Sequence, residues 1–335
     1  MEIEATIVRL HLAETFRISR ESTDHADVLH VAITHDGVTG FGEAAPIERY
    51  AESVESARAF VDEHGDAVGA DPFALEEIGA TLGAIPGEQA AKCAIDAALH
   101  DLQGKLLGLS TWRLLGFRRS GPPTSWTVWL GDPDDMARRA EAASARFQRL
   151  KLKLGGGDGL DVERVRAVRS ATALPLQVDV NEWWSLDEAL EALPQLAELG
   201  VEYCEQPLRE GDEGGRTLRE RSPIPVYVDE DCHTLADVEA CSRIAHGINI
   251  KLAKSGGIRE AVRMAHAARA LGLGVMLGCM IESGLGIAAG CCVAPLCDHV
   301  DLDGNLLLAE DPCPGVEFAD GTQTPSDRPG LGVHV

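Results

Sequence analysis

The chain has 335 residues, more than the roughly 250 of a single β/α barrel, so its length allows a second, smaller unit. It carries 54 acidic and 30 basic residues, which gives a formal net charge of -24. This charge argues against nucleic acids and anionic membranes as partners, because both bind positively charged surfaces.

The sequence gives little indication of a targeting segment, a membrane-spanning segment or a disulfide framework. The amino terminus lacks the apolar core of a signal peptide, and no later segment offers about 18 uncharged apolar residues. Nine cysteines are scattered without Cys-x-x-Cys or Cys/His spacing, which predicts reduced thiols rather than a disulfide framework or a zinc site. We therefore expect a cytoplasmic protein with a small-molecule substrate, and we leave its oligomeric state open, a homo-oligomer included.

Residues 1–118 are predicted to form a separate α+β domain. Apolar and polar residues alternate in three segments, which predicts an antiparallel meander with a turn at Asp36 and Gly37. The predicted strands are Met1–His11, Val28–Thr34 and Val38–Gly42. After these strands, apolar residues recur with the period of a helix in three segments. The predicted helices are Ser53–His64, Phe73–Leu82 and Pro86–Leu107.

From residue 119 onward, short apolar runs alternate with helix-length segments, as in a parallel β/α barrel spanning residues 119–310. The predicted strands are Ser125–Leu130, Arg149–Leu154, Leu176–Val180, Val201–Glu205, Val226–Asp229, Gly247–Leu252, Leu273–Leu277 and Val300–Leu302. The predicted helices are Asp134–Phe147, Asp161–Ala171, Leu186–Leu199, Thr217–Arg221, Leu235–Ile244, Ile258–Leu271 and Leu285–Val293. No GxGxxG follows a strand, which argues against a dinucleotide-binding sheet. The tail, residues 311–335, is predicted to return to the first domain.

Two lysines share one face of the second barrel strand. In the run RLKLKL, alternation places Lys151 and Lys153 on one side and the leucines on the other. If the leucines pack against the helices, both ammonium groups point into the barrel; the alternative is a solvated edge strand. A desolvated lysine beside another cation has a lowered pKa, which suits a general base.

Three acids end successive strands, namely Asp179, Glu205 and Asp229. Neighbouring carboxylates repel one another unless a cation lies between them, and oxygen ligands favour a hard ion such as Mg²⁺. The alternative is three separate acids that pair with arginines or helix N-termini. Alternation gives Asp231 the same side as Asp229, so spacing does not choose between these two.

Lys251 ends the sixth strand, diametrically opposite the second strand and Lys153. Two opposed lysines with a metal between them suit the removal and return of a proton next to a metal-bound carboxylate. Lys254 is interpreted as the start of a loop or helix without a role in proton transfer.

The last strand carries Asp301 and Asp303 on one face. Two carboxylates at the mouth of the barrel would suit a cationic substrate group such as an ammonium. A buried structural pair held by an arginine is the alternative, while the resemblance of DLDGN to part of a calcium loop lacks the remaining ligand positions.

Six segments, KLKLGGG, VDVNEWW, EQPL, VDED, INIKLAKSGG and MIESGLG, together resemble the strand motifs of the enolase superfamily in its muconate lactonising subgroup. The resemblance implies a modified TIM barrel with an α+β capping domain built from the N-terminal region and the C-terminal tail. It implies that Lys153 and Lys251 are the acid/base pair and that Lys151 polarises the substrate carboxylate. The implied Mg²⁺ ligands are Asp179, Glu205 and Asp229.

Within this superfamily, the mandelate racemase branch carries a histidine base after strand seven, whereas residues 278–282 here contain none. The pair Asp301 and Asp303 is similar to the one that holds the substrate ammonium in dipeptide epimerases. We therefore expect epimerisation at the α-carbon of the C-terminal residue of a dipeptide. The segment FRISR resembles the mobile specificity loop, so Arg20, or alternatively Arg17, is expected to meet a substrate carboxylate.

The resemblance leaves other activities open on the same site: N-acylamino-acid racemase, o-succinylbenzoate synthase and muconate cycloisomerase. A more remote alternative is a barrel that binds metal without catalysis. The segment VDED replaces a more usual ADES-like run, and the tryptophans of VNEWW stand where a smaller residue often follows. Both departures leave the side-chain preference open.

Overall fold

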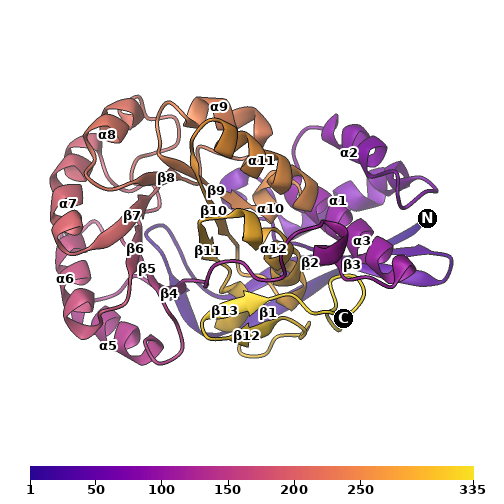
Figure 1. Cartoon of the computed structure of the whole chain (residues 1–335), viewed down its shortest axis with the longest axis horizontal. Helices are drawn as coiled ribbons and strands as arrows, with labels where there is room; N and C mark the ends of the chain where they lie inside the picture. Colours follow the sequence, from indigo (N-terminus) through magenta and orange to yellow (C-terminus); the bar gives the residue numbers. More distant parts are fainter.

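Two sheets of different type organise the chain (Figure 1). The computed structural model describes all 335 residues. An antiparallel sheet has the order β1-β2-β3, and a parallel sheet has the order β4 to β11 without any change of sequence order. The predicted capped barrel is confirmed. No helix combines the length and apolar composition needed to cross a membrane.

The first unit packs helices against the antiparallel sheet. Its strands are β1 (Glu2–Arg17), β2 (Ser22–His35) and β3 (Val38–Ala44). Its helical segments are η1 (Glu48–Tyr50), α1 (Val54–His64), η2 (Gly65–Val68), α2 (Leu75–Gly83), α3 (Gln89–Leu107) and α4 (Thr111–Leu114). Helix α3 approaches β3 so closely that a Cβ at Gly42 would lie 2.0 Å from the Ala94 carbonyl oxygen. Glycine at this position therefore permits the packing.

The second unit is the barrel. Its strands are β4 (Trp126–Val128), β5 (Leu150–Lys153), β6 (Leu176–Asp179), β7 (Val201–Glu205), β8 (Val226–Val228), β9 (Gly247–Lys251), β10 (Gly274–Gly278) and β11 (His299–Asp301). The ring closes where Thr124, before β4, bridges in parallel to Val300, and the Ser125 N–H donates to the Val300 carbonyl at 2.9 Å.

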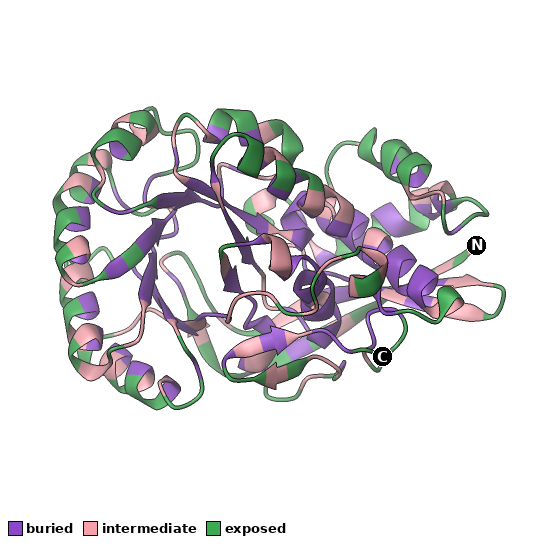
Figure 2. Ribbon diagram, viewed as in Figure 1, coloured by how far each residue is buried: buried purple, intermediate pink, exposed green.

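Helices surround the barrel strands, which are buried inside, and most of these helices have exposed residues on the side away from the strands (Figure 2). They are α5 (Pro133–Ala143), α6 (Asp161–Ala171), α7 (Leu186–Glu198), α8 (Gly215–Arg221), η3 (Leu235–Asp237), α9 (Val238–Cys241), α10 (Leu252–Ser255), α11 (Ile258–Ala270), α12 (Gly284–Val293), η4 (Ala294–Leu296) and η5 (Gly304–Leu307). The tail forms β12 (Glu317–Ala319) and β13 (Thr322–Thr324), and its Leu331 N–H donates to Asp101 of α3 at 2.7 Å.

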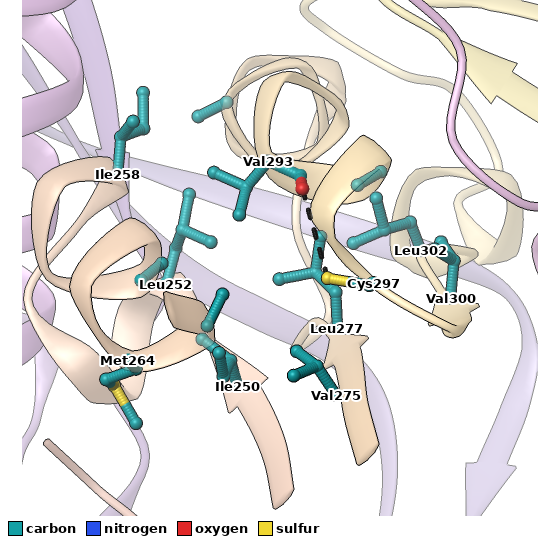
Figure 3. Close-up of a cluster of buried hydrophobic side chains, with 14 of the residues drawn as sticks. Ile250, Leu252, Ile258, Met264, Val275, Leu277, Val293, Cys297, Val300 and Leu302 are labelled. Atoms are coloured by element: carbon teal, nitrogen blue, oxygen red, sulfur yellow. Dashed lines mark hydrogen bonds between the residues drawn. The ribbon is translucent and has the colours of Figure 1, made fainter. Parts of the chain in front are cut away.

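Strand alternation separates the core from the site. In β9, β10 and β11, the apolar residues Ile250, Leu277 and Val300 pack in one buried cluster with α11 and α12 (Figure 3). The residues that follow them in sequence are Lys251, Gly278 and Asp301. Because successive side chains point to opposite faces, the same pattern that builds this core directs the charged side chains inward.

Several predicted boundaries were wrong, including the start of β2, which lies at Ser22 rather than at Val28. Strand β1 runs to Arg17 rather than ending at His11, because its last residues are held by pairing with β2 and not by an apolar face. The predicted helix Leu235–Ile244 is a 3₁₀ turn followed by α9, which ends at Cys241. Strand β9 ends at Lys251, and α10 begins at the next residue.

Candidate active site

The carboxyl ends of the barrel strands bring the predicted charged residues together. In-register pairing puts Lys153 beside Asp179 and Asp179 beside Glu205. Asp229 follows β8 directly, while Lys251 and Asp301 are the last residues of β9 and β11. The chain thus assembles at one end of the barrel side chains that lie far apart in sequence.

A cavity of about 380 Å³ lies between this end of the barrel and the first unit. Lysines 151, 153 and 251 line it, and so do Asp301 and Asp303. The side chains of Lys153 and Lys251 are 11% and 12% exposed, whereas that of Lys151 is 2% exposed. Lys153 and Lys251 are therefore the more accessible ammonium groups, and they come from the second and the sixth strand.

Each buried carboxylate at the strand ends has a lysine partner. The Lys153 ammonium donates to Asp179 at 2.6 Å, and that of Lys251 donates to Asp229 at 2.8 Å. The Lys151 nitrogen lies 2.8 Å from Glu205 Oε2 and 2.7 Å from Asp301 Oδ2. The site is a dense network of alternating charges whose side chains are mostly buried.

The pKa values of the three carboxylates differ in direction. Burial opposes ionisation of Asp179, but the adjacent Lys153 and Lys151 ammonium groups lower its pKa to about 2. Burial acts likewise on Asp229, and Lys251 and Lys254 lower its pKa below its usual range. At Glu205, burial and repulsion from Asp179 prevail and raise the pKa. The three acids therefore interact strongly with one another and with the lysines.

The pKa values of two lysines are raised, whereas the sequence predicts that a desolvated lysine beside another cation has a lowered pKa. Burial favours the neutral form of Lys151, but Asp301 and Glu205 raise its pKa well above the ordinary value. The pKa of Lys251 is also raised, because Asp229 and Glu205 outweigh its burial. Neighbouring carboxylates, rather than neighbouring cations, thus determine the charge state of these two side chains in this structure.

The donor set fits Mg²⁺. No three His, Cys, Asp or Glu side chains share a ready metal-ligating geometry, since lysines pair with the three carboxylates. Yet Asp179, Glu205 and Asp229 supply only oxygen donors, as this hard cation requires. Glu205 Oε2 is buried and lies 2.8 Å from the Lys151 ammonium without forming a hydrogen bond, and Glu205 and Asp179 repel each other. A divalent cation would relieve this repulsion.

Asp301 and Asp303 line the same cavity, and Asp301 joins the charge network through Lys151. Asp303 accepts a hydrogen bond from the Thr127 N–H at 2.7 Å. Burial, reinforced by the negative charge of Asp301, raises the pKa of Asp303 to about 7. Asp301 Oδ1 is buried without a hydrogen-bond partner. This pair has the free acceptor and the negative charge that a substrate ammonium needs.

The two candidate arginines differ in position. Arg20 lines the cavity, but its guanidinium lies 3.1 Å from Glu182 and 2.9 Å from Glu230. Arg17 is exposed and is not part of the cavity wall. Arg20 is thus the better placed of the two, although its charge is already balanced by two carboxylates.

The structure separates Asp229 from Asp231. Asp231 accepts hydrogen bonds from Gln206 Nε2 at 2.7 Å and from the Gly211 N–H at 2.8 Å, outside the lysine–carboxylate network. Gln206 also accepts from the Asp229 N–H at 2.8 Å. Gln206 thus orients the turn that carries both acids, and sequence spacing gave no sign of it.

Two further polar residues belong to the site. Lys254 lies in a helix, as the sequence predicts, but it is fully buried and its ammonium donates to an Asp229 carboxylate oxygen at 2.6 Å. Asn249 of β9 donates to Glu205 Oε1 at 2.7 Å. Asn249 precedes Lys251 by two residues on the same inward face, and this spacing was the available signal.

Comparisons with known proteins agree with this geometry. Residues 2–116 match the family model described as mandelate racemase / muconate lactonizing enzyme, N-terminal domain. Residues 135–335 match the model described as enolase C-terminal domain-like. The two matches together cover most of the chain.

Several of the similar individual proteins are dipeptide epimerases. An L-Ala-D/L-Glu epimerase from Bacteroides thetaiotaomicron is 38% identical over 97% of this chain and 85% of its own. A hydrophobic dipeptide epimerase from Roseobacter litoralis is 36% identical over 99% and 98%. The crystal structure of a dipeptide epimerase from Enterococcus faecalis with Mg and L-Leu-L-Tyr is 30% identical, with TM-score 0.95 over 99% of both chains.

Proposed function

Since this chain belongs to the mandelate racemase / muconate lactonizing enzyme family of enolase-like proteins, we propose that it is a Mg²⁺-dependent dipeptide epimerase. The observation that carries the proposal is the combination of two accessible lysines on opposite strands with the Asp301 and Asp303 pair on the same cavity wall. The first feature supplies 1,1-proton transfer, and the second supplies a binding site for a free α-ammonium.

Lys153 and Lys251 act on opposite faces of the substrate α-carbon. One lysine, in its neutral form, accepts the α-proton at Nζ, and the other, as an ammonium, donates a proton to the opposite face. Reversing the roles epimerises the other diastereomer. General acid–base catalysis of this kind contributes roughly 10²–10⁴-fold to a rate.

Lys151 keeps its charge among Asp301, Glu205 and Asp179. Its ammonium is therefore a fixed positive group next to the place that the substrate carboxylate would occupy. The carboxylates of Asp179, Glu205 and Asp229 would hold Mg²⁺. When bound, this ion supplies positive charge that stabilises the negative charge developing on the substrate carboxylate.

The proposal is tested with Mg²⁺ and a mixed L,L-dipeptide library in D₂O. Deuterium should enter the C-terminal α-position, and new diastereomers should appear, as read by mass spectrometry and NMR. N-acylamino acids, succinylbenzoate precursors and muconate serve as matched alternative substrates. If an acylamino acid exchanges its α-proton and no dipeptide does, the assignment as an epimerase of dipeptides is wrong.

The pKa of Asp303 predicts how substrate binding depends on pH. Because that pKa is raised to about 7, Asp303 is mostly neutral at lower pH and attracts an ammonium less strongly. The KM for a dipeptide should therefore fall as the pH rises from about 5.5 to about 7, a range in which the dipeptide ammonium, with a pKa of about 8, stays charged. In Asp303→Asn, KM should be higher and nearly independent of pH over this range. Steady-state kinetics at several pH values measure both, and a parallel pH profile in the variant would contradict the role of Asp303.

A further inference from the structure

Glu182 lies where the barrel meets two cavity-lining segments of the capping unit. It follows β6 in a tight turn in which Asn181 and Glu182 both have positive φ, 49° and 68°. Non-glycine residues adopt this conformation rarely, and it persists where surrounding contacts hold it. One such contact is the hydrogen bond from the Glu182 N–H to the Gln206 carbonyl, at 2.8 Å. The turn presents the Glu182 carboxylate to the capping unit.

This carboxylate binds one arginine from each capping segment. Arg49 donates from Nε to Oε2 at 2.9 Å and from Nη2 to Oε1 at 2.8 Å. Arg20 donates from Nη1 to Oε2 at 3.1 Å, and the Glu210 N–H completes the set at 3.0 Å. The Glu182 side chain is 12% exposed, and those of Arg20 and Arg49 are 28% and 33% exposed, so water screens these contacts in part.

These contacts balance the positive charge of Arg20. Its second partner is Glu230, whose side chain is fully buried and whose Oε1 lies 2.9 Å from Arg20 Nη2. The guanidinium therefore lies between two carboxylates. The three lysines that line the cavity are paired with acids of the site. A carboxylate on a substrate side chain would therefore find no arginine or lysine free of an acidic partner on the cavity wall.

The rest of the wall holds acidic, polar and apolar side chains. Glu21 and Glu48 line the cavity, are exposed to solvent and form no ion pair, so they add negative charge that repels an acid. Apolar side chains from both units line the cavity as well. They include Phe16, Ile18, Ile47, Met280 and Ile281.

We propose that Glu182 is a positioning residue that sets the substrate class: by holding Arg20 and Arg49 against the barrel, it makes the cavity select an apolar over an acidic side chain at the epimerised residue. The inference rests on the proposed function, and it concerns the substrate side chain rather than the chemistry. It also gives Arg20 a role other than the binding of a substrate carboxylate that the sequence predicts.

The test compares L-Ala-L-Leu with L-Ala-L-Glu. In the wild-type protein, kcat/KM should be at least about tenfold higher for L-Ala-L-Leu, because like charges brought together in a partly desolvated site repel strongly. Glu182→Gln keeps the size of the side chain and removes one negative charge beside Arg20. This variant should lower the ratio of kcat/KM for L-Ala-L-Leu to kcat/KM for L-Ala-L-Glu by about tenfold, mainly through a lower KM for L-Ala-L-Glu.

Two further variants separate this role from a general effect on folding. Glu182→Asp keeps the charge and should restore much of the wild-type ratio. Glu198→Gln, in an exposed residue of α7 without an ion pair, should leave the ratio unchanged. Thermal melting shows whether each variant is folded.

Distinct outcomes overturn distinct claims. A wild-type preference for L-Ala-L-Glu overturns the apolar substrate class and needs no variant. An equal loss of kcat/KM for both dipeptides in Glu182→Gln shows a purely structural role and overturns the positioning role. If neither these nor any other dipeptide exchanges its α-proton, the proposed function itself fails.

Discussion

Replacing either Lys153 or Lys251 by alanine is expected to abolish epimerisation, with a fall in kcat of at least roughly 10³-fold. Each variant loses one of the two groups that exchange a proton with the α-carbon, and the lysine that remains reaches only one face. No other lysine on the cavity wall has comparable exposure, since Lys151 is 2% exposed and is bound by three carboxylates. Chiral chromatography of the products measures the loss.

Exchange of the α-proton in D₂O distinguishes a mechanism with two lysine bases from one with a single base. In D₂O, each single variant should still exchange the α-proton of one diastereomer, the one whose proton faces the remaining lysine, without forming the other diastereomer. Arg166→Ala, in an exposed residue of α6, is a suitable control and should keep full activity. Full epimerisation by either lysine variant would rule out the two-base mechanism.

The positions of these lysines could be predicted from local pattern and from topology together. Alternation in RLKLKL placed Lys151 and Lys153 on one strand face, and strand order placed Lys251 on the opposite side of the barrel. Both inferences depend only on periodicity and on the regular succession of parallel strands. For the same reason Asp179 and Glu205 could be predicted as neighbours, and the structure pairs them in register.

The remaining contacts depend on tertiary structure. Arg20 meets Glu182 across 162 positions of sequence, in a turn whose positive φ angles no pattern of apolar residues reveals. Lys254 reaches Asp229 because its long side chain turns back from α10, whereas its local sequence indicates only the start of a helix. The raised pKa of Lys251 likewise depends on the distance to a carboxylate and not on neighbours in sequence.

Glu205→Gln is expected to lower Mg²⁺-dependent kcat by at least about 10²-fold and to change the stability of the protein in a way that depends on pH. An amide carries no negative charge, so it is a poorer ligand for a hard cation than a carboxylate. It has nearly the same shape, and its carbonyl oxygen can still accept the hydrogen bond that Asn249 donates to Glu205 at 2.7 Å. Activity and stability should therefore respond differently to this change.

The pKa of Glu205 gives the sign of the stability effect. Burial and Asp179 raise it in the folded protein, so the folded state binds this proton more tightly than the unfolded state does. The stability that this proton contributes is present at low pH and is lost as the pH rises through the folded-state pKa. Glutamine does not titrate, so the melting temperature of the variant relative to wild type should increase with pH when no metal is added.

Magnesium titrations complete the comparison. Mg²⁺ should raise the melting temperature of the wild-type protein, because a ligand that binds only the folded state stabilises it by mass action. EDTA should remove both this increase and the activity, and added Mg²⁺ should restore both. In Glu205→Gln the increase should be small or absent even where the variant is the more stable protein. Equal Mg²⁺ responses and equal turnover in the two proteins would exclude Glu205 from the metal site, and the carboxylates of Asp179 and Asp229 would then need another partner.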